Sequence, residues 1–321
     1  MKPRVICILL AVAALSVAAI LVDPTRVVLG KLLGDSFFQA RPTRFWARSL
    51  RAEPGQRADA RSQLEQGGAD AVPVLVGILM NWPGPGDAEL RCTAAEILTN
   101  LGPDAADAAP ALVAALHDDD PHVQAVCAAA LPKVGVPADT AVPELTELLK
   151  SRHVVNVVVA ARALSQYRGA VATSLPVLVA VLQDESQSAE ARWNAARTIG
   201  KIGPAAVSAV PALIDASHDK EWTIREHCAE SIGEIGPTAA PLGVAALESM
   251  LADPHHRVRR DAVRSLGYFG QAAQETLPEI NKLVDDPEEI VRQAAKTAIA
   301  AITPRQVQPT DEPVDTVISP K

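Results

Sequence analysis

The stretch RWNAARTIGKIGPAAVSAVPALIDASHD, from Arg192 to Asp219, decides the fold of this 321-residue chain. It contains a helix-forming segment, a Gly-Pro stop at Gly203 and Pro204, and a second helix-forming segment with Pro211 near its start. Glycine readily ends a helix, and proline is best tolerated in the first turn, where its missing N–H costs least. The stretch therefore predicts two helices joined by a sharp turn.

The same unit recurs along most of the chain. A glycine marks each copy at intervals of 33 or 34 residues: Gly68, Gly102, Gly135, Gly169, Gly203, Gly236 and Gly270. The fourth copy aligns one residue earlier, with Arg168 in the glycine column. Self-similarity at this period is typical of solenoids of stacked helix pairs. We therefore predict an all-α fold, an α-solenoid of about seven helix pairs.

Apolar residues in each copy are spaced as on one face of a helix. Counting back from the glycine, they occupy positions −12, −8, −4 and −1. The −8 column is small, as at Ala195 and Cys228, and the −4 column is branched, as at Ile199 and Ile232. Small residues opposite branched ones let helix axes approach to about 8–10 Å. Because no copy can bury these faces alone, we expect one continuous core.

A column of arginines lies eleven residues before the glycine. Its members are Arg57, Arg91, Arg192, Arg225, Arg259 and, in a final half-copy, Arg292. The third and fourth copies have Gln124 and Val157 instead, and acidic residues such as Asp253 cluster in the turns ahead of many arginines. A planar guanidinium can bridge carboxylates or carbonyls of adjacent copies. We interpret the column as a structural ladder between repeats rather than as a ligand site.

The run AARTIGKIGPAAVSAVPALIDAS, with Arg192 ahead of it, resembles the short HEAT-like repeats first named for phycobilisome lyases. The resemblance covers roughly residues 57 to 302 and implies an α-α superhelix, here of a bacterial membrane-anchored or exported type. That superfamily includes scaffolds, chromophore lyases and an iron hydroxylase. The resemblance is therefore specific for the repeat and not for a function.

Composition and charge narrow the classes of function. Hydrophobic residues make up 48% of the chain and aromatic residues only 3%, as expected of helices packed on helices. A net charge of −8 argues against a general nucleic-acid binder, which needs a basic surface. The four cysteines show no CxxC spacing, so neither a disulfide framework nor a zinc site is predicted. We expect no cofactor.

The N-terminus carries a membrane-directed segment. Residues Val5 to Val22 are apolar apart from Ser16 and follow Lys2 and Arg4, which is the pattern of an uncleaved anchor or of a signal peptide. The chain then divides into residues 1–25, the signal anchor or signal peptide; 26–56, a juxtamembrane segment and N-terminal cap; 57–302, the solenoid; and 303–321, a disordered tail. We expect a membrane-anchored or exported protein with an extracytoplasmic solenoid.

One enzymatic alternative follows from the resemblance. Deoxyhypusine hydroxylase, a helical-repeat relative, holds two irons with repeated His-Glu pairs. Only Glu226-His227 is similar to such a pair, in reversed order, and the column of His227 holds no second histidine. A di-iron site needs several converging ligands, so we predict that the chain is not an enzyme. A lyase or hydroxylase of this superfamily is the alternative.

Two surfaces are candidates for binding a partner. We expect the second helices to line the concave side, where their outward residues are Glu144, Glu147, Asp215, Glu248, Glu279 and Lys282. This acidity predicts a partner with a basic or polar segment. The second candidate is a basic patch, Arg257, Arg260 and Arg264, which could bind an anion. The sequence favours a protein-interaction scaffold at a membrane and names neither the partner nor the oligomeric state.

Overall fold

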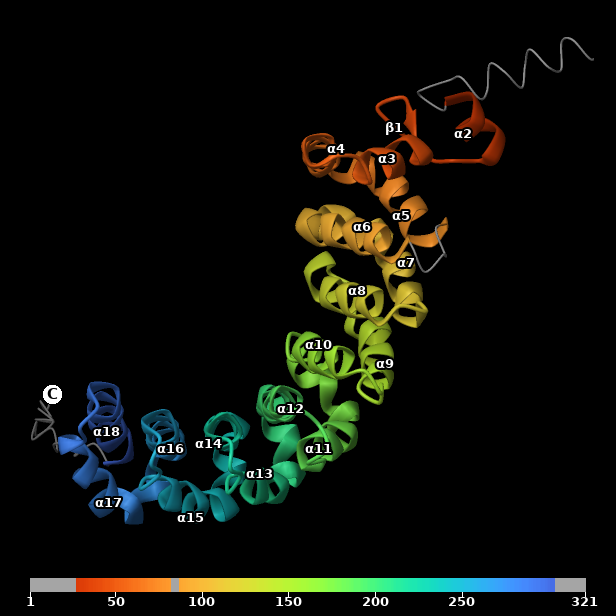
Figure 1. Ribbon diagram of the computed structural model, residues 1–321. Helices are drawn as coiled ribbons and strands as arrows, with labels where there is room; N and C mark the ends of the chain where they lie inside the picture. The colour runs from red at the N-terminus through yellow and green to blue at the C-terminus, as the bar shows by residue number, and fades with distance from the viewer. Residues whose placement is uncertain (1–26, 82–86, 304–321) are drawn as a thin grey trace, which may run out of the picture.

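The computed structural model describes residues 27–81 and 87–303, and these form helix pairs stacked into a curved arc (Figure 1). The prediction of an all-α solenoid is confirmed. The predicted membrane segment and most of the predicted tail lie outside the described residues, so both stay predictions.

The two helices of each pair are called first and second helices in chain order. The first helices are α4 (Pro54–Gln66), α6 (Ala88–Leu101), α8 (Pro121–Val134), α10 (Val154–Leu164), α12 (Ala189–Ile202), α14 (Trp222–Ile235), α16 (His256–Phe269) and the closing α18 (Glu289–Ile302). The second helices are α5 (Val72–Asn81), α7 (Ala109–Ala114), α9 (Ala138–Leu148), α11 (Leu175–Gln183), α13 (Val210–Ala216), α15 (Ala240–Met250) and α17 (Leu277–Lys282).

Short 3₁₀ turns join the two helices of most pairs. They are η1 (Gly68–Ala71), η3 (Gly102–Ala108), η5 (Arg168–Ser174), η6 (Gly203–Ala209), η7 (Pro237–Ala239) and η8 (Gly270–Thr276). Two more, η4 (Ala115–His117) and η9 (Leu283–Asp285), extend α7 and α17. The repeated prolines thus fall at or next to the start of most second helices.

The segment before the first repeat packs on the end of the stack. It comprises α2 (Val27–Leu33), a short hairpin of β1 (Phe37–Phe38) and β2 (Arg41–Pro42), and α3 (Thr43–Leu50). Trp46 of α3 is 1% exposed, and its indole N–H donates to the Phe38 carbonyl at 3.2 Å. The Thr43 hydroxyl donates to the Ser36 carbonyl at 3.1 Å.

The first helices line the inside of the arc and the second helices line the outside (Figure 1). The expectation that second helices form the concave side is therefore wrong. The physical reason lies in the packing, since first helices contact one another more extensively than second helices do. A stack whose elements are closer on one side curves toward that side.

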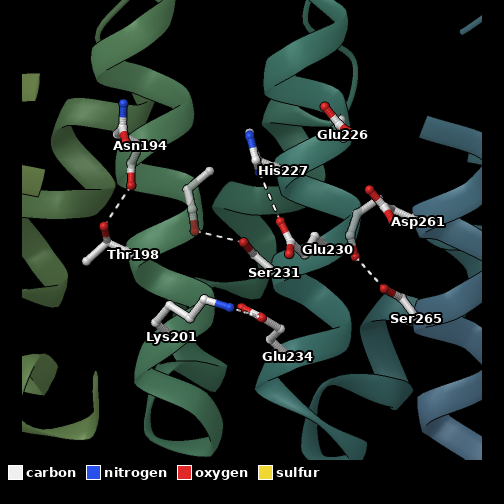
Figure 2. Close-up of polar contacts among 12 residues, drawn as sticks. Asn194, Thr198, Lys201, Glu226, His227, Glu230, Ser231, Glu234, Asp261 and Ser265 are labelled. Atoms are coloured by element: carbon white, nitrogen blue, oxygen red, sulfur yellow. Dashed lines mark hydrogen bonds and ion pairs between the residues drawn. The ribbon is translucent and has the colours of Figure 1, made fainter. Parts of the chain in front are cut away.

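Small residues make this close approach of the first helices feasible. A Cβ added to Gly200 would lie 2.8 Å from the Ser231 Cα, and one added to Gly233 would lie 2.8 Å from the Ser265 Cα. The Ser231 hydroxyl donates to the Ala196 carbonyl at 2.8 Å across this interface (Figure 2). Neighbouring first helices therefore meet through side-chain-to-backbone hydrogen bonds in the C-terminal repeats.

The backbone conformation explains why glycine recurs at this position of the repeat. Gly236 has φ 87° and ψ −165°, and Gly203 has φ 75° and ψ −146°, a region that is essentially restricted to glycine. Arg168, which the alignment places in this column, also has a positive φ of 49°. The neighbouring Gly169 is not among the positive-φ residues, which supports the alignment of the fourth copy one residue earlier.

One described stretch has the length and hydropathy needed to cross a membrane. It runs from Ala189 to Ala216 and comprises α12, η6 and α13, with half of its most apolar window buried. Its two halves are separated at Gly203, and α12 packs against α10, α11 and α14 within the stack. The apolar residues of this stretch therefore form part of the solenoid core.

The glycine column gives a direct test of the backbone argument. Gly236→Ala should lower the free energy of unfolding by about 1–3 kcal/mol, because alanine is strained at this positive φ. No atom lies within 4 Å of the added methyl group, so steric contact does not contribute. Urea unfolding followed by circular dichroism measures the change.

Gly55→Ala is the matched control, since the added methyl group also meets nothing within 4 Å but φ is not in the positive range. It should change stability by less than about 1 kcal/mol, in the stabilising direction. Equal destabilisation by both substitutions would contradict the conformational explanation.

Candidate protein-interaction surfaces

Arginines of the repeated column connect successive repeats. Arg225 donates from Nε and Nη2 to the two carboxylate oxygens of Asp253, at 2.7 and 2.9 Å, and from Nη1 to the Asp219 carbonyl at 2.9 Å. Arg259 repeats this arrangement with Asp286, at 2.8 and 2.9 Å. Each guanidinium thus holds the turn ahead of its own helix and the turn of the next repeat.

Four of these pairs are shielded from solvent. They are Arg91–Asp118, Arg192–Asp219, Arg225–Asp253 and Arg259–Asp286, with side chains 2–14% exposed. Arg57 differs, because it pairs with Glu89 while 47% and 84% of the two side chains are exposed. Arg292, in the closing helix, donates to the Asp286 and Pro287 carbonyls.

The aspartate of each bridge has a second role in its own turn. Asp253 Oδ1 accepts a hydrogen bond from the His255 amide, and Asp286 Oδ1 accepts one from the Glu288 amide. Asp219 does the same for Glu221 and was missed in the sequence. Each of the three aspartates stands seventeen residues before the next position of the glycine column, which is Gly236, Gly270 or Thr303. This constant spacing is the sequence signal that could have identified them.

The bridges shift the acidity of their carboxyl groups. Burial by itself would raise the pKa of Asp253, but hydrogen bonds from Arg225 and the His255 amide outweigh it and lower the pKa. Burial would also raise the pKa of Asp286, but hydrogen bonds from Arg259 and the Glu288 amide outweigh it and lower the pKa. Both side chains therefore stabilise the folded state when they are ionised.

The ladder is interrupted at the third and fourth repeats. Gln124 replaces arginine in α8, and its Nε2 donates to the Asp118 carbonyl at 2.6 Å. Asn156 of α10, which is fully buried, donates to Gln124 Oε1. Val157 occupies the arginine position of α10, and neutral contacts replace the ion pair there.

The basic patch predicted near the start of α16 is largely neutralised by carboxylates. Arg260 donates to both oxygens of its neighbour Asp261, at 2.8 and 2.6 Å, and to Glu226 at 3.0 Å. Arg264 donates to Asp261 at 3.2 Å, and the Arg257 guanidinium lies 5.6 Å from the Trp222 ring centroid. Arg260 and Arg264 were predicted as anion contacts, and they are held by buried carboxylates that the sequence did not pair with them.

The second helices, which carry the predicted acidic residues, form the outside of the arc (Figure 1). Glu144 accepts from His117 at 3.0 Å, Glu147 from Lys150 at 2.6 Å and Glu279 from Lys282 at 2.6 Å. The structure does not gather Asp215 and Glu248 with these three pairs into one site. The set forms a dispersed row of surface charges.

The Glu226-His227 sequence does not form a ligand pair. Figure 2 shows the His227 ring turned toward Glu230, which it contacts at 3.0 Å, while Glu226 is held by Arg260. The His227 ring also stacks on Trp193 with centroids 4.7 Å apart. Burial raises the pKa of Glu226. Within residues 27–81 and 87–303 no group of three or more His, Cys, Asp or Glu is arranged to hold a metal.

A cleft lies between two neighbouring first helices. It has a volume of about 510 Å³, lies between α8 and α10, and has Pro132, Lys133 and Val159 among its lining residues. Most of its lining residues stand at positions outside the core columns of the first helices, which form the inside of the arc, whereas Tyr167 occupies a −1 core position. This cleft was not predicted from the sequence.

These features define a curved α-solenoid whose repeats are joined by arginine–aspartate bridges. The family model described as HEAT repeats matches residues 72–165, 110–189, 175–262 and 244–311, and the chain belongs to this family. Among curated proteins, none has a sequence that matches the chain significantly.

Solved structures show the same architecture. An engineered protein solved by a structural genomics consortium is similar with a TM-score of 0.56 and 20% identity, over 81% of this chain and 78% of that one. A second engineered protein gives 0.50 and 22%, over 60% and 94%. A homology model of the full-length AP-3 complex in an intermediate open conformation gives 0.59 and 14%, over 82% and 51%. These similarities establish the fold.

Removing a shielded bridge should destabilise the stack. Arg225→Ala should lower the free energy of unfolding by about 2–3 kcal/mol, because it leaves the 8%-exposed Asp253 without its charge partner. Chemical denaturation at pH 7 measures the loss.

Arg57→Ala is the control for Arg225→Ala, since it removes an arginine of the same column from an exposed pair. It should cost less than about 1 kcal/mol. A similar cost for both arginines would show that shielding of the bridge does not matter.

Acid should weaken the same bridges. The folded-state pKa of Asp253 is below the ordinary value of 3.8, so its contribution is complete above about pH 5 and is lost as the pH falls below about 4. Asp253→Asn should therefore be less stable than wild type at pH 7, and the difference should shrink by pH 3. Unfolding curves at pH 7, 5 and 3 test this, with Asp59→Asn, at an exposed position of α4, as the control.

Proposed function

We propose that this chain is a non-enzymatic protein-interaction scaffold at a membrane, which binds a partner protein on the concave face of its solenoid. The apolar run Val5 to Val22 supports the membrane attachment and an extracytoplasmic position of the solenoid. HEAT repeats typically mediate protein–protein interactions, and a solenoid of similar fold belongs to the AP-3 complex, a protein assembly.

The curvature of the stack is the observation that supports a binding site on the concave face. First helices present their outward residues to the inside of the arc, so side chains from several repeats face a shared space (Figure 1). Such extended inner surfaces are what solenoids commonly use for binding. The second helices, which carry the predicted acidic residues, form the outside of the arc.

Membrane attachment can be tested in cells of a bacterial host. The full chain should fractionate with membranes, whereas a chain lacking residues 1–25 should be released, because the apolar run is removed. Protease added outside the inner membrane should digest the solenoid of the full chain. A solenoid protected from this protease would contradict the extracytoplasmic position.

The scaffold function predicts a stable protein partner and no stoichiometric prosthetic group. Crosslinking in membranes followed by purification should recover one protein in constant ratio to the chain, and that protein should bind the purified solenoid again. Elemental analysis and absorption spectra of the solenoid provide the enzymatic comparison. One or two equivalents of iron, or a bound chromophore, would instead favour a hydroxylase or lyase.

A further inference from the structure

The cleft between α8 and α10 has apolar walls and a basic rim. Ala129, Pro132, Val159 and Tyr167 line it, and Lys133 and Arg162 stand at its edge, both exposed. In the part of the chain that the structure describes, neither cation has a carboxylate within 4.0 Å, unlike Arg260 and Arg264 further along the inner face. These charges are therefore free to meet a ligand.

The cleft opens where the seal between first helices is missing. At the α12–α14 and α14–α16 junctions, the residue three before the repeat glycine is itself a glycine, and it contacts a serine five residues before the next repeat glycine. These pairs are Gly200 with Ser231 and Gly233 with Ser265. In α8 and α10 the same two positions hold Pro132 and Ala163, which both line the cleft. The pyrrolidine ring occupies the contact position, and alanine supplies no hydroxyl to bond the facing backbone.

Tyr167 lines the cleft and joins the two repeats that form it. Its hydroxyl donates to the Val136 carbonyl at 3.2 Å, across the two repeats. Burial raises the pKa of Tyr167 to about 12, so the hydroxyl keeps its proton. The cleft is thus a built feature of this junction.

The chemistry of the cleft selects the occupant. A volume of about 510 Å³ falls within the range of binding pockets and accepts aliphatic side chains. The outward strip of α10 continues from Val159 to Val155, which is 37% exposed, so apolar contact extends beyond the cleft along the helix. Unpaired cations beside apolar walls, on a chain of net charge −8, are complementary to carboxylates flanking aliphatic residues.

We propose that the α8–α10 cleft binds an acidic segment with aliphatic side chains from a partner protein. The aliphatic groups occupy the apolar cleft, and the carboxylates pair with Lys133 and Arg162. This inference rests on the proposed scaffold function and adds the chemistry of the partner and its position.

The test uses the full chain and three labelled ten-residue peptides with capped ends. One alternates Asp with Leu, one alternates Asp with Ser, and one alternates Lys with Leu. Fluorescence anisotropy should show binding of the Asp–Leu peptide at least about tenfold tighter than of the other two, and weaker at high salt. Equal binding of the Asp–Ser peptide would overturn the apolar part of the proposal, and equal binding of the Lys–Leu peptide its charge part.

Two kinds of variant locate the peptide. The double variant Lys133→Glu with Arg162→Glu should bind the Asp–Leu peptide about tenfold or more weakly. Lys220→Glu with Lys296→Glu makes the same charge change elsewhere and should leave the affinity unchanged. Pro132→Gly with Ala163→Ser restores the seal of the later repeats and should abolish binding while keeping both cations. Ala129→Trp fills the cleft as a second route if the sealed variant does not fold by circular dichroism. Unchanged affinity in the charge-reversal pair and in a folded filled variant would overturn the proposal.

Other occupants give different results. If a second copy of the chain fills the cleft, sedimentation should show self-association that Lys133→Glu with Arg162→Glu removes. If the chain's own residues 304–321 fill it, their removal should strengthen peptide binding about tenfold. Either result would overturn the proposal that the cleft binds a segment of another protein. A crosslinked partner that the charge-reversal pair retains would place the scaffold's site elsewhere, whereas the absence of any partner would contradict the scaffold function itself.

Discussion

The curvature of this protein depends on how closely its first helices approach one another. In the C-terminal repeats a hydroxyl on one first helix bonds the backbone of the preceding one, as Ser265 does with the Ala229 carbonyl at 2.7 Å. This contact requires that no large side chain stands between the helices, and Gly233 meets that requirement. The second helices, which lack this device, remain further apart and become the outside of the arc.

The arginine–aspartate bridges act on a different part of the same junction. They join the turns that precede successive first helices, so they fix the N-terminal ends of these helices, whereas the serine and glycine contacts lie toward the C-terminal ends. Each aspartate satisfies both a guanidinium and an amide of its own turn, as Asp286 does for Arg259 and Glu288. A substitution at one aspartate therefore disturbs two repeats.

The repeat, its helices and its core columns could be predicted from the sequence because each depends on local spacing. The alignment of Arg168 with the glycines shows this, since its φ of 49° follows the column and not the residue type. The inside and outside of the arc could not be predicted, because they depend on the relative closeness of two helix layers. The role of Asp219 does not follow from the acidity of its turn, because it depends on one fixed position within the turn.

The interrupted third and fourth repeats show how both devices relate to the candidate site. Where Gln124 and Val157 replace the arginines, Pro132 and Ala163 also replace the residues that seal later repeats. This junction instead relies on apolar packing and on neutral hydrogen bonds from the buried Asn156 and from Tyr167. The cleft between α8 and α10 lies where both devices are missing, and the Arg91–Asp118 and Arg192–Asp219 bridges flank this interrupted region.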